Sequence, residues 1–140
     1  MTPERHHEKA ERFERSLALC GDADHEARIE GAMLAASHWI NFALHALALA
    51  PPEKDFQHPY FLTDDERSTY DQALGPELLR AYDEIEDLRP FYVRGADADG
   101  ATAGRRAIAL LGLIRDGALA KSTGARPPAI ESRPRTPARP

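Results

Sequence analysis

The stretch HEARIEGAMLAASHWINFALHALALA, residues 25–50, decides the fold of this chain. It is long enough for about seven helical turns, and it stops at a pair of prolines. At about 100° per residue, one face of the helix carries Ile29, Ala36, Ile40, Ala43 and Leu47. The opposite face carries Gly31, Leu34, Ala35, His38, Phe42, His45 and Leu49, with Asn41 beside the histidines. A helix that is apolar on both sides is buried on both sides. The stretch therefore predicts the central helix of an all-helical domain, or a helix that also forms a dimer seam.

Signals for the start and end of helices flank this stretch on both sides. Thr2 and Pro3 are typical of a helix start, and Thr63 with Glu66 forms the pattern of a capping box. Residues 51–62 are rich in aromatic side chains and predict a loop. The predicted helices span about residues 3–20, 25–50, 63–74, 76–93 and 102–120. Short connections between them predict an antiparallel bundle of four to five helices.

Composition divides the 140 residues into one domain, residues 1–120, and a tail, residues 121–140. The tail holds five prolines in twenty residues and five basic side chains against one acidic side chain, a net charge of +4. Such a segment buries little apolar surface and predicts a disordered, polyproline-like tail. The formal charge of the whole chain is −5, so the domain carries −9. An acidic body argues against broad, non-specific binding of nucleic acid.

The sequence also indicates the cellular location of the protein. The lone Cys20 excludes an intramolecular disulfide framework, and the charged N-terminal residues lack the apolar core of a signal peptide. Polar side chains interrupt the longest apolar stretch, which favours a core helix over a membrane span. We therefore expect a cytoplasmic protein without membrane contact. The sequence has no glycine-rich phosphate loop and no paired-cysteine motif, and no cofactor is predicted.

His38, Asn41 and His45 share one face of the central helix, because they lie three and four residues apart. They are predicted to be hydrogen-bonded core residues or the lining of a polar pocket. No carboxylate lies among them, so we do not expect a metal site here. The neighbouring pair His6 and His7 is predicted to be a solvated helix end.

Arg89 is the second candidate for chemistry. It lies on the same helical line as the apolar residues Leu78, Tyr82, Ile85 and Tyr92. A charge on such a line needs a partner, because an unpaired buried charge is costly. The partner is predicted to be a carboxylate of this chain, such as Glu30, or a bound phosphate.

The segment around Arg89, DLRPFYVRG at residues 87–95, resembles the end of the third helix in the HEPN superfamily. The resemblance covers about residues 4–120 and implies an all-helical fold. The family motif is an arginine followed, after four to six residues, by a histidine that serves ribonuclease activity across a dimer. Arg89 matches the arginine, but Arg94 stands where the histidine belongs. Since an arginine cannot exchange protons near neutral pH, the resemblance implies a non-catalytic or degenerate member.

The sequence thus predicts a HEPN-like homodimer that binds RNA or a nucleotide, or a toxin–antitoxin-type partner such as a nucleotidyltransferase. The residues predicted to bind phosphate are Arg89, Arg94, Tyr92, His38, Asn41 and His45. A different class of protein is the first alternative: an enzyme resembling the DinB family, with His38, His45 and His58 as metal ligands. The second alternative is a scaffold protein that has no small-molecule ligand.

Overall fold

The computed structural model describes residues 1–124, which form only helices, turns and loops. The α-helices are α1 (Pro3–Leu17), α2 (His25–Ala46), α3 (Asp64–Leu74), α4 (Pro76–Tyr92) and α5 (Gly100–Gly124), and the short 3₁₀ turns are η1 (Asp22–Asp24) and η2 (Pro59–Phe61). The predicted all-helical bundle is therefore confirmed. The last helix is longer than predicted and includes Lys121–Gly124 of the expected tail, whereas residues 125–140 lie outside the described range.

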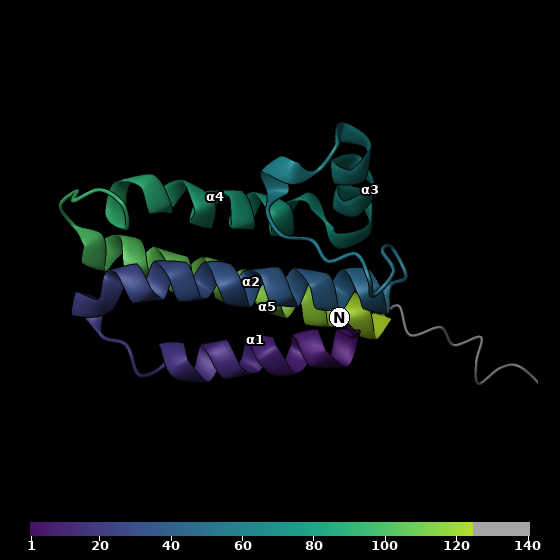
Figure 1. Cartoon of the computed structure of the whole chain (residues 1–140), viewed down its shortest axis with the longest axis horizontal. Coiled ribbons are helices and arrows are strands. Elements are labelled where there is room, and N and C mark those ends of the chain that lie inside the picture. Colours follow the sequence, from purple (N-terminus) through teal and green to yellow (C-terminus); the bar gives the residue numbers. More distant parts are fainter. Residues whose placement is uncertain (125–140) are drawn as a thin grey trace, which may run out of the picture.

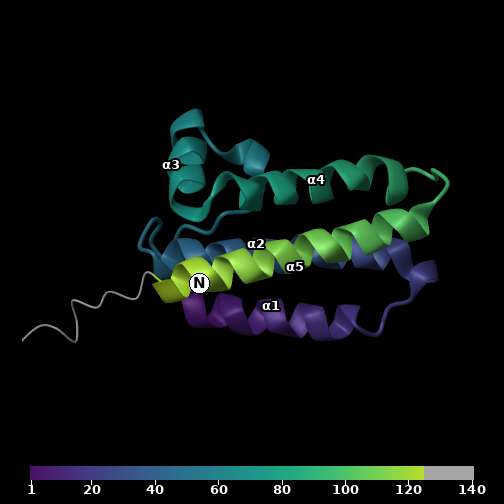
Figure 2. The same cartoon turned by 180° about the vertical axis from the view of Figure 1, so that it is seen from behind.

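The four long helices lie side by side, and consecutive ones run in alternating directions (Figures 1 and 2). Helix α2 packs against α1, α4 and α5, so it is the central helix of the bundle. The shorter α3 lies at one end of α4, away from the α1 side of the molecule. Because α1 and α2 are antiparallel, the beginning of α1 lies beside the end of α2 (Figure 1).

The apolar face predicted for α2 is buried within the single chain. Ile29, Ala36, Ile40 and Ala43 have no exposed surface, whereas Leu47, the fifth residue of the predicted face, follows the helix and is only partly buried. The opposite face is only partly covered: Ala35 is fully buried, but Leu34 is 41% exposed. The helix therefore belongs to the intramolecular core along its first face and reaches the surface along part of the second.

Helix α2 ends at Ala46 and not at Ala50 as predicted. The physical reason is Ala48, which has a φ of 58° in the left-handed region. This turn lets the N–H of Leu49 donate to the carbonyl of Leu44 at 2.8 Å, the bonding that closes many helix C-termini. The chain then enters the loop that precedes α3.

The capping box predicted at the start of α3 is present. The Thr63 hydroxyl accepts from the N–H of Glu66 at 3.1 Å, and the Glu66 carboxylate accepts from the N–H of Thr63 at 3.0 Å. Thr2 likewise caps α1 by accepting from the N–H of Arg5 at 3.3 Å. Within residues 1–124, no helix is both long enough and apolar enough to cross a membrane.

Candidate functional site

Three histidines and an aspartate meet where α1, the end of α2 and the following loop come together. His6 Nε2 lies 3.0 Å from Asp55 Oδ1, and His45 Nε2 lies 2.9 Å from the same oxygen. His6 Nδ1 lies 2.9 Å from Nδ1 of His38. We call His6, His38, His45 and Asp55 the His–Asp cluster. The α-amino group of Met1 lies 3.3 Å from the same oxygen of Asp55.

The helices bring the three histidines together. His38 and His45 are seven residues apart, two turns of α2, and therefore share a face. His6 lies in the second turn of α1, which passes beside the end of α2. The prediction that His6 is a solvated helix end is wrong, because its side chain is only 1% exposed. Packing of α1 against α2 covers it.

The loop after α2 is fixed to the bundle by the two residues that follow Asp55. The side chain of Asn41 donates to the carbonyl of Phe56 at 2.7 Å and accepts from its N–H at 2.6 Å. The hydroxyl of Tyr82 donates to the carbonyl of Gln57 at 2.9 Å. Asn41, predicted to be a core or binding residue, thus positions the backbone next to Asp55 and is itself 1% exposed.

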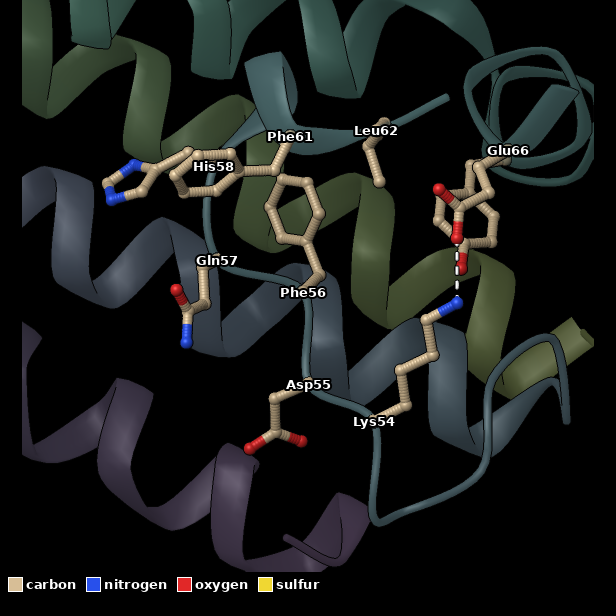
Figure 3. Close-up of a pocket in the computed structure, with 9 residues that line it drawn as sticks. Lys54, Asp55, Phe56, Gln57, His58, Phe61, Leu62 and Glu66 are labelled. Atoms are coloured by element: carbon tan, nitrogen blue, oxygen red, sulfur yellow. Dashed lines mark hydrogen bonds and ion pairs between the residues drawn. The ribbon is translucent and has the colours of Figure 1, made fainter. Parts of the chain in front are cut away.

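Asp55 and Phe56 point to opposite sides of this extended segment (Figure 3). The carboxylate of Asp55 points toward α1, whereas Phe56 points to the side where the Lys54–Glu66 ion pair, 2.7 Å long, is drawn. A cavity of about 200 Å³ lies along the loop, lined by Lys54, Asp55, Phe56, Gln57, His58, Phe61, Leu62, Glu66 and Tyr70. The nitrogen and oxygen atoms of the His–Asp cluster therefore meet on the α1 side of the loop.

The hydrogen bonds of His45 determine where its proton lies. Nδ1 of His45 is 3.0 Å from the carbonyl oxygen of Ala50. Since a carbonyl only accepts, Nδ1 must carry a proton, and Nε2 of a neutral His45 then has none. That bare nitrogen would lie 2.9 Å from a carboxylate oxygen of Asp55, so two lone pairs would face each other. The contact is favourable only when a proton or a metal ion lies between the two atoms.

Burial and charge set the protonation of the other members. Burial lowers the pKa of His6, although the contact with Asp55 opposes it. Burial, with a smaller contribution from His6, lowers the pKa of His38 to about 4. Burial alone raises the pKa of Asp55, but the hydrogen bonds from His6 and His45 outweigh it and the pKa falls. At neutral pH the cluster therefore contains a carboxylate beside neutral His6 and His38 rings.

The geometry suits a metal ion. Ligand atoms of His6, His45 and Asp55 all lie within 4.8 Å of one another. Bonds of about 2.0–2.2 Å to a tetrahedral ion place neighbouring ligand atoms about 3.3 Å apart, and the two nitrogen–oxygen distances, 3.0 and 2.9 Å, are within a few tenths of an ångström of that spacing. The side chain of Asp55 is 35% exposed, which gives access from solvent. Contrary to the expectation from the sequence, residues able to hold a metal do converge here, because the missing carboxylate comes from the loop.

Arg89 lies in a separate group of charges. Its guanidinium pairs with Glu30 through Nε–Oε1 at 2.7 Å and Nη2–Oε2 at 3.4 Å, and with Glu86 at 3.2 Å. Of the two partners predicted for Arg89, the carboxylate is therefore the one observed. Phosphate binding by Arg89, with Tyr92 and Arg94 near the end of α4, stays a prediction, and it would require the phosphate to displace carboxylates.

His58 belongs to the same group as Arg89. Its Nδ1 lies 2.7 Å from Oε1 of Glu86, the carboxylate that also binds Arg89. The residues predicted as one phosphate pocket are thus divided between two places: His38, Asn41 and His45 beside Asp55, and Arg89 beside Glu30 and Glu86. The DinB-like ligand set is divided as well, since His58 is bound to Glu86 while His38 and His45 belong to the His–Asp cluster.

Comparisons with protein-family models, curated proteins and solved structures found no match to this chain. The resemblances to the HEPN and DinB families therefore stay predictions.

Proposed function

We propose that the protein binds a divalent transition-metal ion through His6, His45 and Asp55. One observation carries the proposal: two imidazole nitrogens face a single carboxylate oxygen at 3.0 and 2.9 Å. The backbone carbonyl of Ala50 holds the other nitrogen of His45 and so directs the lone pair of Nε2 toward that oxygen. A metal ion bound by these three atoms would take the place of the proton that the contact between His45 and Asp55 otherwise requires.

The donor set selects a class of metal. Two imidazoles and one carboxylate suit Zn²⁺ and the neighbouring ions Fe²⁺, Co²⁺ and Ni²⁺, whereas Mg²⁺ and Ca²⁺ prefer oxygen ligands. Three protein ligands leave at least one coordination position for water or a substrate, as in catalytic zinc sites. The exposed side of Asp55 is where that position would open to solvent.

A bound ion would also connect parts of the chain that are distant in sequence. His6 comes from α1, His45 from the end of α2, and Asp55 from the loop that follows. An ion that binds the folded chain and not the unfolded one stabilises the fold by mass action. Metal binding by this site should therefore be measurable both directly and as an increase in thermal stability.

Protein prepared without a histidine tag and freed of metal with a chelator should bind one Co²⁺ or Zn²⁺ per chain. At a free metal concentration 100 times the Kd, the fold should gain about 2.7 kcal/mol, and Mg²⁺ should give no gain. Calorimetric titration and thermal unfolding followed by circular dichroism would measure both effects. Absence of binding at equimolar metal, or an equal response to Mg²⁺, would contradict the proposal.

We propose RNA or nucleotide binding by a HEPN-like module as the second candidate function. The observation that favours it is the exposed aromatic surface beside the Arg89 group: Tyr60 and Phe61 are 66% and 65% exposed. The ring of Tyr60 stacks on that of His58, with centroids 5.0 Å apart and planes 7° apart. Unpaired bases stack on such rings. The expected homodimer, the nucleotidyltransferase-type or toxin–antitoxin partner and the cytoplasmic location belong to this candidate.

Replacing Tyr60 with serine should weaken binding of single-stranded RNA by about 5- to 150-fold, because stacking is worth about 1–3 kcal/mol per base. Fluorescence anisotropy with a labelled oligonucleotide would measure the loss. Leu113→Ser is the control, since Leu113 is also an exposed apolar residue but lies in α5, outside the segment predicted to bind phosphate. If the wild-type protein leaves the oligonucleotide free at micromolar concentrations, this candidate is excluded.

A further inference from the structure

His38 contacts the metal-site residues through His6. Its Nδ1 lies 2.9 Å from Nδ1 of His6, whereas His6 and His45 are the imidazoles that reach Asp55. Two neutral imidazole nitrogens at this distance share one proton: one ring donates and the other accepts. The pair therefore has two possible arrangements, which differ in the tautomer of His6.

In the first arrangement, His38 donates to His6. A neutral His6 then has its proton on Nε2 and donates it to Asp55. This arrangement satisfies His6 when no metal is bound. In the second arrangement, His6 donates from Nδ1 and His38 accepts. Nε2 of His6 is then bare, and only in this tautomer can it bind a metal ion.

We propose that His38 is a positioning residue that accepts the proton of His6 Nδ1 and thereby sets His6 in its metal-binding tautomer. The inference rests on the proposed metal site and concerns a residue that does not itself bind the ion. It assigns to His38 the role that the carbonyl of Ala50 has for His45.

His38 differs from the carbonyl of Ala50 in one respect that gives it a role beyond a structural contact. A carbonyl can only accept, so Ala50 holds His45 permanently in one tautomer. An imidazole can accept or donate, so His38 satisfies His6 both before and after metal binding. His6 can therefore be neutral and hydrogen-bonded in the metal-free protein, and it can present a lone pair once the ion arrives.

The surroundings of His38 favour its neutral, accepting form. Its ring stacks on that of Phe13, with centroids 5.8 Å apart and planes 19° apart, and lies 5.1 Å from the ring of His6. The groups packed against it are a phenyl ring and a second imidazole, and its Nδ1 contacts a ring nitrogen and not a carboxylate oxygen. An uncharged ring retains one nitrogen lone pair, which is what the hydrogen bond from His6 requires.

Two substitutions of His38 test this role in the metal-loaded protein, with Co²⁺ as the probe. His38→Leu removes both the donor and the acceptor, whereas His38→Gln supplies an amide that has both. We expect His38→Leu to weaken Co²⁺ binding by about 10–100-fold, the usual effect of losing the group that orients a ligand histidine. His38→Gln should recover most of the affinity. His7→Gln, one residue from His6 but directed at the rings of Trp39 and Phe42, is the control.

Two spectroscopic readings separate positioning from other roles. The visible spectrum of bound Co²⁺ should be the same in His38→Leu and the wild type, since the ligands are unchanged. With diamagnetic Zn²⁺ in place of paramagnetic Co²⁺, long-range ¹H–¹⁵N NMR correlations should show the proton of His6 on Nδ1 in the loaded wild type and in His38→Gln. This NMR result tests the proposal even where His38→Leu fails to fold.

Three results would overturn the inference. Unchanged affinity in a folded His38→Leu variant would show that His6 needs no partner. A changed Co²⁺ spectrum in that variant would make His38 a ligand. A proton on Nε2 of His6 in the loaded protein would place the metal elsewhere. Failure of the proposed function is distinguishable, because the wild-type protein itself would then bind no Co²⁺.

Discussion

Replacing His45 with alanine should weaken Co²⁺ or Zn²⁺ binding by more than about 100-fold, beyond the usual effect of losing an orienting group. The substitution removes one of three ligands and also the ring that faces Asp55 at 2.9 Å. Calorimetric titration of metal-free wild type and variant would measure the loss. His7→Ala is the matched control, because His7 lies in α1 next to His6 but outside the His–Asp cluster.

Asp55→Asn tests the same site with a smaller change in side-chain structure. The amide keeps the shape of the side chain but removes the negative charge that attracts the ion. The loop should keep its position, because the two hydrogen bonds between Asn41 and the backbone of Phe56 do not involve Asp55. Metal affinity should therefore fall while the circular dichroism spectrum stays unchanged. Wild-type affinity in both His45→Ala and Asp55→Asn would exclude this cluster as the metal site.

The fold could be predicted because its signals are local. The capping box of Thr63 and Glu66 and the apolar face of α2 depend on residues three to four positions apart, and both are observed. The C-terminal end of α2 was predicted less accurately, at Ala50 and not at Ala46. Its left-handed residue is Ala48, whereas glycine or asparagine is the usual signal for that conformation.

Only part of the candidate site could be predicted from the sequence. His38 and His45 share a face of α2, which the helical period shows directly. His6 also carried a signal, since it lies on one helical line with Ala10 and Leu17, both of which are buried. No sequence pattern placed Asp55 beside the histidines, because its position depends on how Asn41 binds the loop backbone.

Arg89 shows that a local sequence pattern can indicate the need for a partner without identifying the partner. Its place on an apolar line predicted a partner, and Glu30 was one of the two partners considered. Glu30 lies 59 positions earlier in the chain, at an Nε–Oε1 distance of 2.7 Å. The helical period shows that a charge needs compensation, but only the packing of α4 against α2 shows which group supplies it.

A glutamate in place of Ala36 should prevent folding. Ala36 has no exposed surface in the centre of α2, which α1, α4 and α5 surround. A carboxylate there would lose its water without gaining a partner, at a cost of several kcal/mol. The longer side chain would add about 1–3 kcal/mol of overpacking. Together these costs approach the whole stability of a typical domain, about 5–15 kcal/mol. Circular dichroism and urea unfolding would measure the loss.

Leu34→Glu is the matched control for this experiment, because Leu34 lies two residues away on the same helix but is 41% exposed. Its stability should stay within about 0.5 kcal/mol of the wild type, as for most surface changes. A stable, folded Ala36→Glu variant would mean that the single chain does not enclose α2. If Leu34→Glu instead converts a dimer to a monomer in light scattering, the exposed part of α2 is the seam of the expected homodimer.

Since α2 carries His38, Asn41 and His45, loss of its packing should also abolish metal binding in Ala36→Glu, and Leu34→Glu should retain it.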